Sequence, residues 1–169
     1  MKKILVVDDE QDLCSLVKKS LEKTGKYIVV TTSLPEEVLG LCAREKPDLI
    51  LLDIVMPNMD GNEILASLKK QKPQASKPLI VVTSGLGEMV YLERSDKWRW
   101  LPNRKVVHER GRIIEEKEAH RAALEYGVDD FIAKPFSPGT LRAVVQEVFD
   151  KREKKQKEKD GGQENGVEG

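Results

Sequence analysis

Acidic side chains directly follow two short apolar runs of the sequence, and this placement is the strongest chemical signal in the chain. Asp8 and Asp9 come after the run 4–7, and Asp53 comes after the run 49–52. If both runs are parallel strands, their carboxyl ends lie at one edge of a sheet, where open α/β proteins bind ligands. Carboxylates in one small volume repel one another, and a hard cation with oxygen ligands relieves that repulsion. The pattern therefore predicts a magnesium site at this edge.

Two further polar residues stand at the same kind of position. Thr83 ends the run 79–82, and Lys134 ends the run 131–133. A lysine ammonium there could meet an incoming phosphoryl oxygen, and a threonine hydroxyl could donate a hydrogen bond to another. A carboxylate nucleophile beside a metal ion, an ammonium and a hydroxyl is a layout for forming an acyl phosphate.

The elements that must position these groups can be predicted from the apolar pattern. Short apolar runs, most of them continuous rather than alternating, are typical of strands covered on both faces: 4–7, 27–30, 49–52, 79–82 and 131–133. Stretches with helical spacing alternate with them: 13–21, 38–42, 64–68, 119–124 and 141–149. This alternation implies right-handed crossovers and an α/β fold with an open parallel sheet.

One segment, from about 86 to 113, does not fit this repeat. It contains aromatic residues among seven basic and four acidic ones: Tyr91, Trp98 and Trp100. The alternation in 97–101 predicts a strand, and the pair 102–103 predicts a turn into a second strand at 105–107. We therefore expect a hairpin in this segment.

Four motifs of the chain resemble the receiver domains of two-component response regulators: Val6-Val7-Asp8-Asp9-Glu10, Leu51-Leu52-Asp53-Ile54-Val55-Met56-Pro57-Asn58-Met59-Asp60-Gly61, Val81-Val82-Thr83-Ser84-Gly85 and Gly127-Val128-Asp129-Asp130-Phe131-Ile132-Ala133-Lys134-Pro135-Phe136. The resemblance covers most of residues 1–150. It implies a flavodoxin-like, doubly wound sheet of five parallel strands in the order 2-1-3-4-5, with helices on both faces. The spacing between the last two motifs is longer than receivers usually have, which places the segment 86–113 as an insertion between strand 4 and helix 4.

The resemblance also implies a role for individual residues. Asp53 would be the phosphoacceptor, and the magnesium ligands would be Asp8, Asp9, Asp53 and the backbone carbonyl of Val55. Thr83 would be the switch hydroxyl and Phe131 the switch aromatic residue. Lys134 would pair with the phosphoryl group, and the Lys134–Pro135 peptide bond would be cis.

The implied function is that of a signalling protein rather than an enzyme, although it would assist its own phosphotransfer and dephosphorylation. A sensor histidine kinase or a phosphotransfer protein would phosphorylate Asp53. The face made by helix 4, strand 5 and helix 5 would then change and control an unknown downstream protein. Two alternatives stay open to different degrees. The chain could be a receiver-like interaction module that is not phosphorylated. A phosphatase of the haloacid-dehalogenase type is disfavoured, because Val55 stands where that class needs a second acid.

The insertion 86–113 has three competing roles. It could contact a partner or a second copy of the chain, which would give a homodimer. It could cover the site and tune hydrolysis of the acyl phosphate. It could bind nucleic acid through its basic residues: Arg94, Lys97, Arg99, Arg104, Lys105, Arg110 and Arg112. Nucleic acid is the least favoured partner, because acids are interspersed and the whole chain balances 29 basic against 29 acidic residues.

Composition sets the remaining expectations. No apolar run approaches the roughly 20 residues that a membrane-spanning helix needs, so we expect a cytoplasmic protein with no membrane partner. Cys14 and Cys42 lack metal-ligand spacing and are expected to be buried. We expect the receiver domain to occupy 1–150 and to be the whole protein. The charged tail 151–169 is expected to be a fraying helix followed by disorder.

Overall fold

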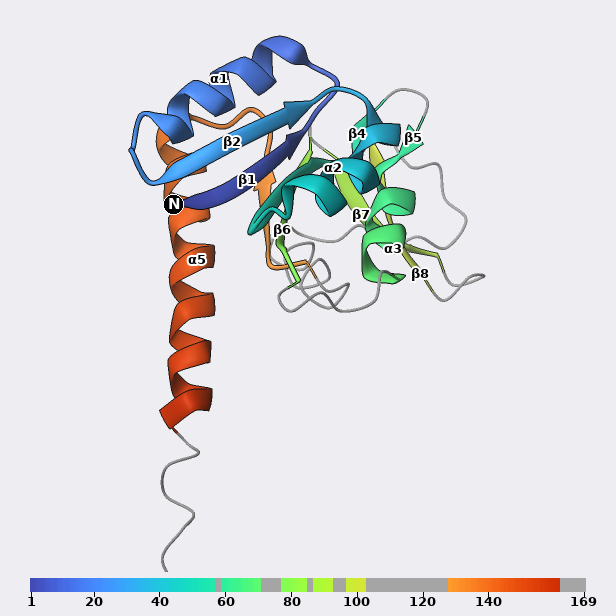
Figure 1. Ribbon diagram of the computed structural model, residues 1–169. Coiled ribbons are helices and arrows are strands. Elements are labelled where there is room, and N and C mark those ends of the chain that lie inside the picture. The colour runs from blue at the N-terminus through green and yellow to red at the C-terminus, as the bar shows by residue number, and fades with distance from the viewer. Residues whose placement is uncertain (57–58, 71–76, 85–86, 93–96, 103–127, 162–169) are drawn as a thin grey trace, which may run out of the picture.

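The centre of the fold is a parallel sheet with a hydrophobic cluster on each of its two faces. The computed structural model describes residues 1–56, 59–70, 77–84, 87–92, 97–102 and 128–161 (Figure 1). The five strands of the sheet lie in the order β2-β1-β3-β6-β9 and all neighbours are parallel. Their bounds are Lys2–Val7 (β1), Tyr27–Thr32 (β2), Leu49–Asp53 (β3), Leu79–Ser84 (β6) and Asp130–Ala133 (β9). The predicted strands and the flavodoxin-like order of the sheet are confirmed.

Helices cover both faces of this sheet, as the doubly wound fold requires. Their bounds are Gln11–Glu22 (α1), Val38–Glu45 (α2), Gly61–Lys70 (α3) and Pro138–Gly161 (α5). A short 3-10 helix, Pro35–Glu37 (η1), leads into α2 with its proline at the first position, where a missing N–H costs nothing. The predicted helix 119–124 lies outside the described residues.

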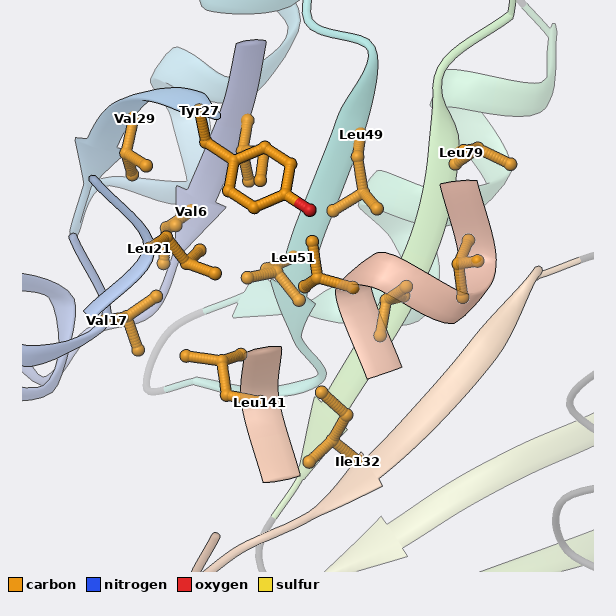
Figure 2. Packing of buried hydrophobic residues seen from close by; sticks show 14 of the residues in the cluster. Val6, Val17, Leu21, Tyr27, Val29, Leu49, Leu51, Leu79, Ile132 and Leu141 are labelled. Carbon is orange, nitrogen blue, oxygen red and sulfur yellow. The ribbon is translucent and has the colours of Figure 1, made fainter. Parts of the chain in front are cut away.

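The alternation of side chains along each strand divides the core into two clusters. One cluster joins the sheet to α2 and α3, and Cys42 belongs to it. The other joins the sheet to α1 and α5, and Cys14 belongs to it. Figure 2 shows Val17 and Leu21 of α1 and Leu141 of α5 gathered around Leu51 of β3. Both cysteines are buried and free, so the expectation of two small core residues is confirmed.

The insertion contains the predicted strand, and a segment that precedes it in the chain pairs with it. Residues Lys97–Pro102 (β8) pair antiparallel with Gly87–Leu92 (β7), which precedes them in the chain. The sequence analysis placed the partner at 105–107, and those residues lie outside the described part of the chain. β7 is rich in apolar and aromatic residues, and the short connection 93–96 lets two adjacent strands pair at little entropic cost. A second small ribbon joins Val55–Met56 (β4) to Met59–Asp60 (β5).

Helix α5 is longer than predicted. It continues past residue 150 to Gly161 and projects beyond the sheet (Figure 1). The first part of the tail, predicted as a fraying helix, is helical over 151–161, and the predicted disordered end at 162–169 lies outside the described residues. Lysine, arginine, glutamate and glutamine favour helix, and Lys151 forms an ion pair of 2.7 Å with Glu147 one turn earlier. The first helix breaker in this stretch is Gly161 itself.

The described helices include none that is both long enough and apolar enough to cross a membrane.

The two-sided packing predicts a large stability cost for shortening Leu51, which is 1% exposed. Leu51→Ala should lower the free energy of unfolding by about 2–5 kcal/mol, because it removes buried methyl groups and leaves a cavity. Leu16→Ala on α1 is the matched control, since Leu16 is 50% exposed. It should change the free energy by less than about 0.5 kcal/mol. Urea denaturation followed by circular dichroism measures both, and equal costs for the two variants would contradict the packing described here.

Candidate functional site

The period of two along each strand places the predicted site residues on one face of the sheet. Asp8, Asp53, Thr83 and Lys134 each lie two positions beyond a core residue of the α1–α5 cluster: Val6, Leu51, Val81 and Ile132 respectively. Residues two apart in a strand point to the same side. The polar site is therefore the continuation of that core cluster past the carboxyl ends of the strands.

The strand register sets how these residues face one another. Asp53 pairs with Thr83 across β3 and β6, and Thr83 pairs with Ile132 across β6 and β9. Lys134 therefore lies two residues further out than this row. A long side chain is needed to reach back from there to β3, and a lysine has that length.

The three aspartates form a compact acidic cluster. One carboxylate oxygen from each of Asp8, Asp9 and Asp53 lies within 4.8 Å of the others. Asp8 and Asp53 are only 3% exposed, and Asp9 is half-buried. Buried carboxylates at this separation need a compensating positive charge or a retained proton.

Lys134 supplies that positive charge to two of the aspartates at once. Its ammonium lies 2.7 Å from Oδ2 of Asp53 and 2.7 Å from Oδ2 of Asp8. The carboxylate of Glu10 lies 3.6 Å away on the exposed side. Burial lowers the pKa of Lys134, but the hydrogen bonds that it donates to Asp53 and Asp8 outweigh burial and leave the pKa raised. The lysine is therefore a fixed cation at neutral pH.

Opposing effects act on Asp8. Burial raises its pKa, while the hydrogen bonds from Lys134 and from the Glu10 amide lower it, and the net pKa is raised. The Glu10 N–H donates to Oδ1 at 3.0 Å, so the two oxygens of Asp8 face different donors. This fixes the plane of the carboxylate.

Two features near the cluster were left open or missed in the sequence analysis. Glu10 contacts Lys134, as described above, which gives it a place beside the cluster. Cys14 was assigned only to the core, yet its thiol donates to the backbone carbonyl of Asp8 at 3.4 Å. Burial is the main cause that raises the pKa of Cys14 to about 11, so it remains a neutral thiol. The sequence signal for this contact was the position of Cys14 on the inner face of α1, shortly after Asp8 and Asp9.

Thr83 and Phe131 lie on opposite sides of the sheet. Thr83 is buried, and its backbone carbonyl accepts from the N–H of Ile54 at 3.2 Å. Phe131 pairs with Val82, half-buried, and packs against the α2–α3 cluster. The register therefore places the two side chains on different faces of the sheet, so neither side chain can move directly into the space that the other one leaves.

The predicted cis peptide bond between Lys134 and Pro135 is present. It directs the chain from β9 into the turn before α5, directly after the lysine that reaches the cluster. The backbone of Val55 lies in β4, paired with Asp60. Its role as a ligand stays a prediction.

Comparison with known proteins agrees with this architecture. A family model described as the response regulator receiver domain matches residues 4–95. The transcriptional regulatory protein PhoP of alkaline phosphatase synthesis in Bacillus subtilis is 34% identical over 152 residues, which are 90% of this chain and 50% of PhoP. The probable transcriptional regulator ycf27 of Guillardia theta is 33% identical over 87% of this chain and 45% of its own length. The chain thus spans about half the length of these relatives.

Among solved structures, NtrX of Brucella abortus superposes with a TM-score of 0.67 and 27% identity, over 95% of this chain and 30% of NtrX. The family model ends within the insertion, before the motif that contains Lys134. The sheet nevertheless brings Lys134 to the acidic cluster. The matched sequence, the strand order and the relatives agree, and the chain belongs to the response regulator receiver domain family of two-component signalling proteins.

Proposed function

We propose that Asp53 accepts a phosphoryl group from a phosphohistidine of a sensor kinase or a phosphotransfer protein. The observation that carries this proposal is the shared ammonium of Lys134, 2.7 Å from both Asp53 and Asp8, beside three clustered carboxylates. A phosphoryl group that arrives at Asp53 meets a cation that is already held in place. The protein is then a signalling switch that assists its own phosphotransfer and dephosphorylation, rather than an enzyme with a separate substrate.

The donor set of the acidic cluster suits magnesium. Carboxylate oxygens are hard ligands, and their separation within 4.8 Å lets one ion contact several of them. The proposed ligands are Asp8, Asp9, Asp53 and the backbone carbonyl of Val55. When bound, the ion would neutralise charge on the carboxylates and on the phosphoryl oxygens.

The residues of this chain have distinct parts in the transfer. A carboxylate oxygen of Asp53 attacks phosphorus, and the phosphorus–nitrogen bond of the phosphohistidine breaks. The bonding pair leaves on the imidazole nitrogen, and an acyl phosphate remains on Asp53. Lys134 stabilises the charge on one phosphoryl oxygen, and the Thr83 hydroxyl, in register with Asp53, donates to another.

The signal would pass from Asp53 through Thr83 to the face that contains Phe131. Because the two side chains lie on opposite sides of the sheet, the coupling runs through the chain that follows β6 rather than by direct contact. Phosphorylation would shift the population between two arrangements of the face formed by the predicted helix 119–124, β9 and α5. That face is the proposed contact with a downstream protein.

We place this function in the cytoplasm, where sensor kinases present their phosphohistidine. The insertion is a second proposed contact surface. The register of β7 and β8 pairs Tyr91 with Trp98 and Met89 with Trp100, which are all large residues. This supports a homodimer or partner contact more than binding of nucleic acid. The relatives named as transcriptional regulators are about twice as long as this chain, and nucleic-acid binding by the whole protein is outside this proposal.

Removing a proposed metal ligand should weaken magnesium binding without unfolding the protein. Asp9→Asn should lower the affinity about tenfold or more, because a carboxylate ligand becomes a neutral amide. Asp12→Asn is the matched control, since Asp12 is an exposed acid in the first turn of α1. Isothermal titration with magnesium chloride measures the affinity. Equal affinity in Asp9→Asn and the control would refute the metal assignment.

Beryllofluoride, a stable mimic of the phosphoryl group, should bind only when Asp53 and magnesium are both present. Fluorine-19 nuclear magnetic resonance should show a bound signal in the wild-type protein and in Asp12→Asn. The signal should be lost in Asp53→Asn, because the amide cannot bond to beryllium as the carboxylate does. A wild-type protein that binds magnesium but gives no bound signal would favour the unphosphorylated interaction module.

Thr83→Val tests the switch separately from acceptance of the phosphoryl group. The change keeps the shape of the side chain and removes its hydroxyl. Beryllofluoride should still bind at Asp53, whereas the shift of the Phe131 ring resonances that follows binding in the wild type should shrink by about half or more. An unchanged shift of the Phe131 ring in Thr83→Val would show that the hydroxyl is not part of the signal.

A further inference from the structure

A second charged site lies at the opposite edge of the sheet from the acidic cluster. A cavity of about 400 Å³ opens between α3, α5 and the beginnings of β6 and β9. Leu79, the first residue of β6, lines it, while Thr83 lies four residues later in the same strand. At the rise of a strand this separation is about 13 Å. The cavity is therefore distinct from the proposed phosphorylation site.

Four basic residues and a single acidic residue line the cavity: Lys77, Lys151, Arg152, Lys155 and Asp129. The carboxylate of Asp129 is already engaged, since its Oδ2 accepts from the backbone N–H of Ile80 at 2.8 Å. The guanidinium of Arg152 donates to the backbone carbonyl of Lys77 at 2.6 Å, which ties α5 to the segment before β6. This hydrogen bond holds the rim of the cavity together. Because its acceptor is a neutral carbonyl, it does not cancel the charge of Arg152.

Three of these cations have no carboxylate partner in the described part of the chain. Lys151 is paired, at 2.7 Å with Glu147 and at 4.0 Å with Asp130, whereas Arg152 bonds only to a backbone carbonyl. Lys77 and Lys155 form no ion pair among the described residues. A concave surface with one sign of charge concentrates ligands of the opposite sign. The rim therefore favours an anion.

The floor of the cavity has a different character from the rim. Leu79 and Val148 are buried, and Leu68 and Pro78 are half-buried, so the groups beneath the cations are apolar. The volume lies within the range of small-molecule sites, roughly 300–1,000 Å³. A bare phosphate ion would leave much of this space and all of the apolar floor unused.

We propose that this cavity binds a small molecule in which a phosphate group is joined through a sugar to a planar ring with apolar faces, the chemistry of a nucleoside phosphate. The phosphate would lie against Lys77 and Lys155, with Arg152 at the rim, through charge-assisted hydrogen bonds. The ring would lie on the apolar floor next to Val148. The modest volume favours such a ligand over the backbone of a nucleic acid.

Adenosine monophosphate is the probe for this site, titrated into the full chain in the presence of a chelator. Without divalent ions the acidic cluster repels the probe, so binding there does not contribute. Nitrogen-15 resonances of Leu79, Asp129 and Val148 should shift in a saturable manner. Lys77→Gln combined with Lys155→Gln should weaken the affinity about tenfold or more, because two charged contacts are lost.

Lys154→Gln combined with Lys157→Gln is the matched control. It removes the same charge from exposed positions of α5 that do not line the cavity, and it should change the affinity less than about twofold. Inorganic phosphate should bind more weakly than the nucleotide. Three outcomes would each overturn the proposal: no saturable binding, equal losses in the two double variants, or phosphate binding as tightly as adenosine monophosphate. Thermal denaturation of each variant checks that the fold is intact.

Discussion

The ammonium of Lys134 is the interaction on which the site depends. It lies between Asp8 and Asp53, which come from different strands and are both buried. Without a cation at this point, burial and mutual repulsion would drive at least one carboxylate to keep a proton. The lysine therefore offsets the negative charge that the buried carboxylates of Asp8 and Asp53 bring together, and its ammonium is a counter-charge that a phosphoryl group at Asp53 would also meet.

This arrangement requires the parallel sheet and its register. The polar residues continue the same rows that hold Val6, Leu51 and Val81 in the core, so the packing of α1 and α5 also fixes the site. A slip of one residue in β3 would turn Asp53 toward the opposite face of the sheet, away from Lys134. Core packing and the position of Asp53 are consequently set by one constraint.

Sequence reasoning was most reliable where the pattern of apolar residues follows directly from burial of a strand. Continuous apolar runs followed by acids gave the strands and the cluster, because a strand buried on both faces has few other solutions. It was less complete where competing choices differ little in local energy. The strand 97–101 was predicted correctly and the pairing with β7 was missed, while the predicted partner at 105–107 lies outside the described residues and stays a prediction. The charged stretch after residue 150 was taken for a fraying end, although its residues favour helix and no breaker precedes Gly161.

The relation between Thr83 and Phe131 lay beyond sequence reasoning for another reason. The register pairs Thr83 with Ile132 and leaves Phe131 on the other face. Only the offset between β6 and β9 decides this, and nothing in either strand alone records it.

The two ends of the sheet carry opposite charge, and this bears on how they could influence each other. Leu79 and Ile80 of β6 line the cationic cavity and Thr83 of the same strand lies near the acidic cluster, while Asp129 and Lys134 directly flank β9 at the same two ends. A ligand at one end can affect the other only if it binds two arrangements of the protein with different affinity. The strands offer few such arrangements, because both of their faces are packed. Helix α5 is better placed, since its first half packs on the sheet while Arg152 and Lys155 line the cavity. Any coupling between the two sites would therefore act through a change in the position of α5 on the sheet.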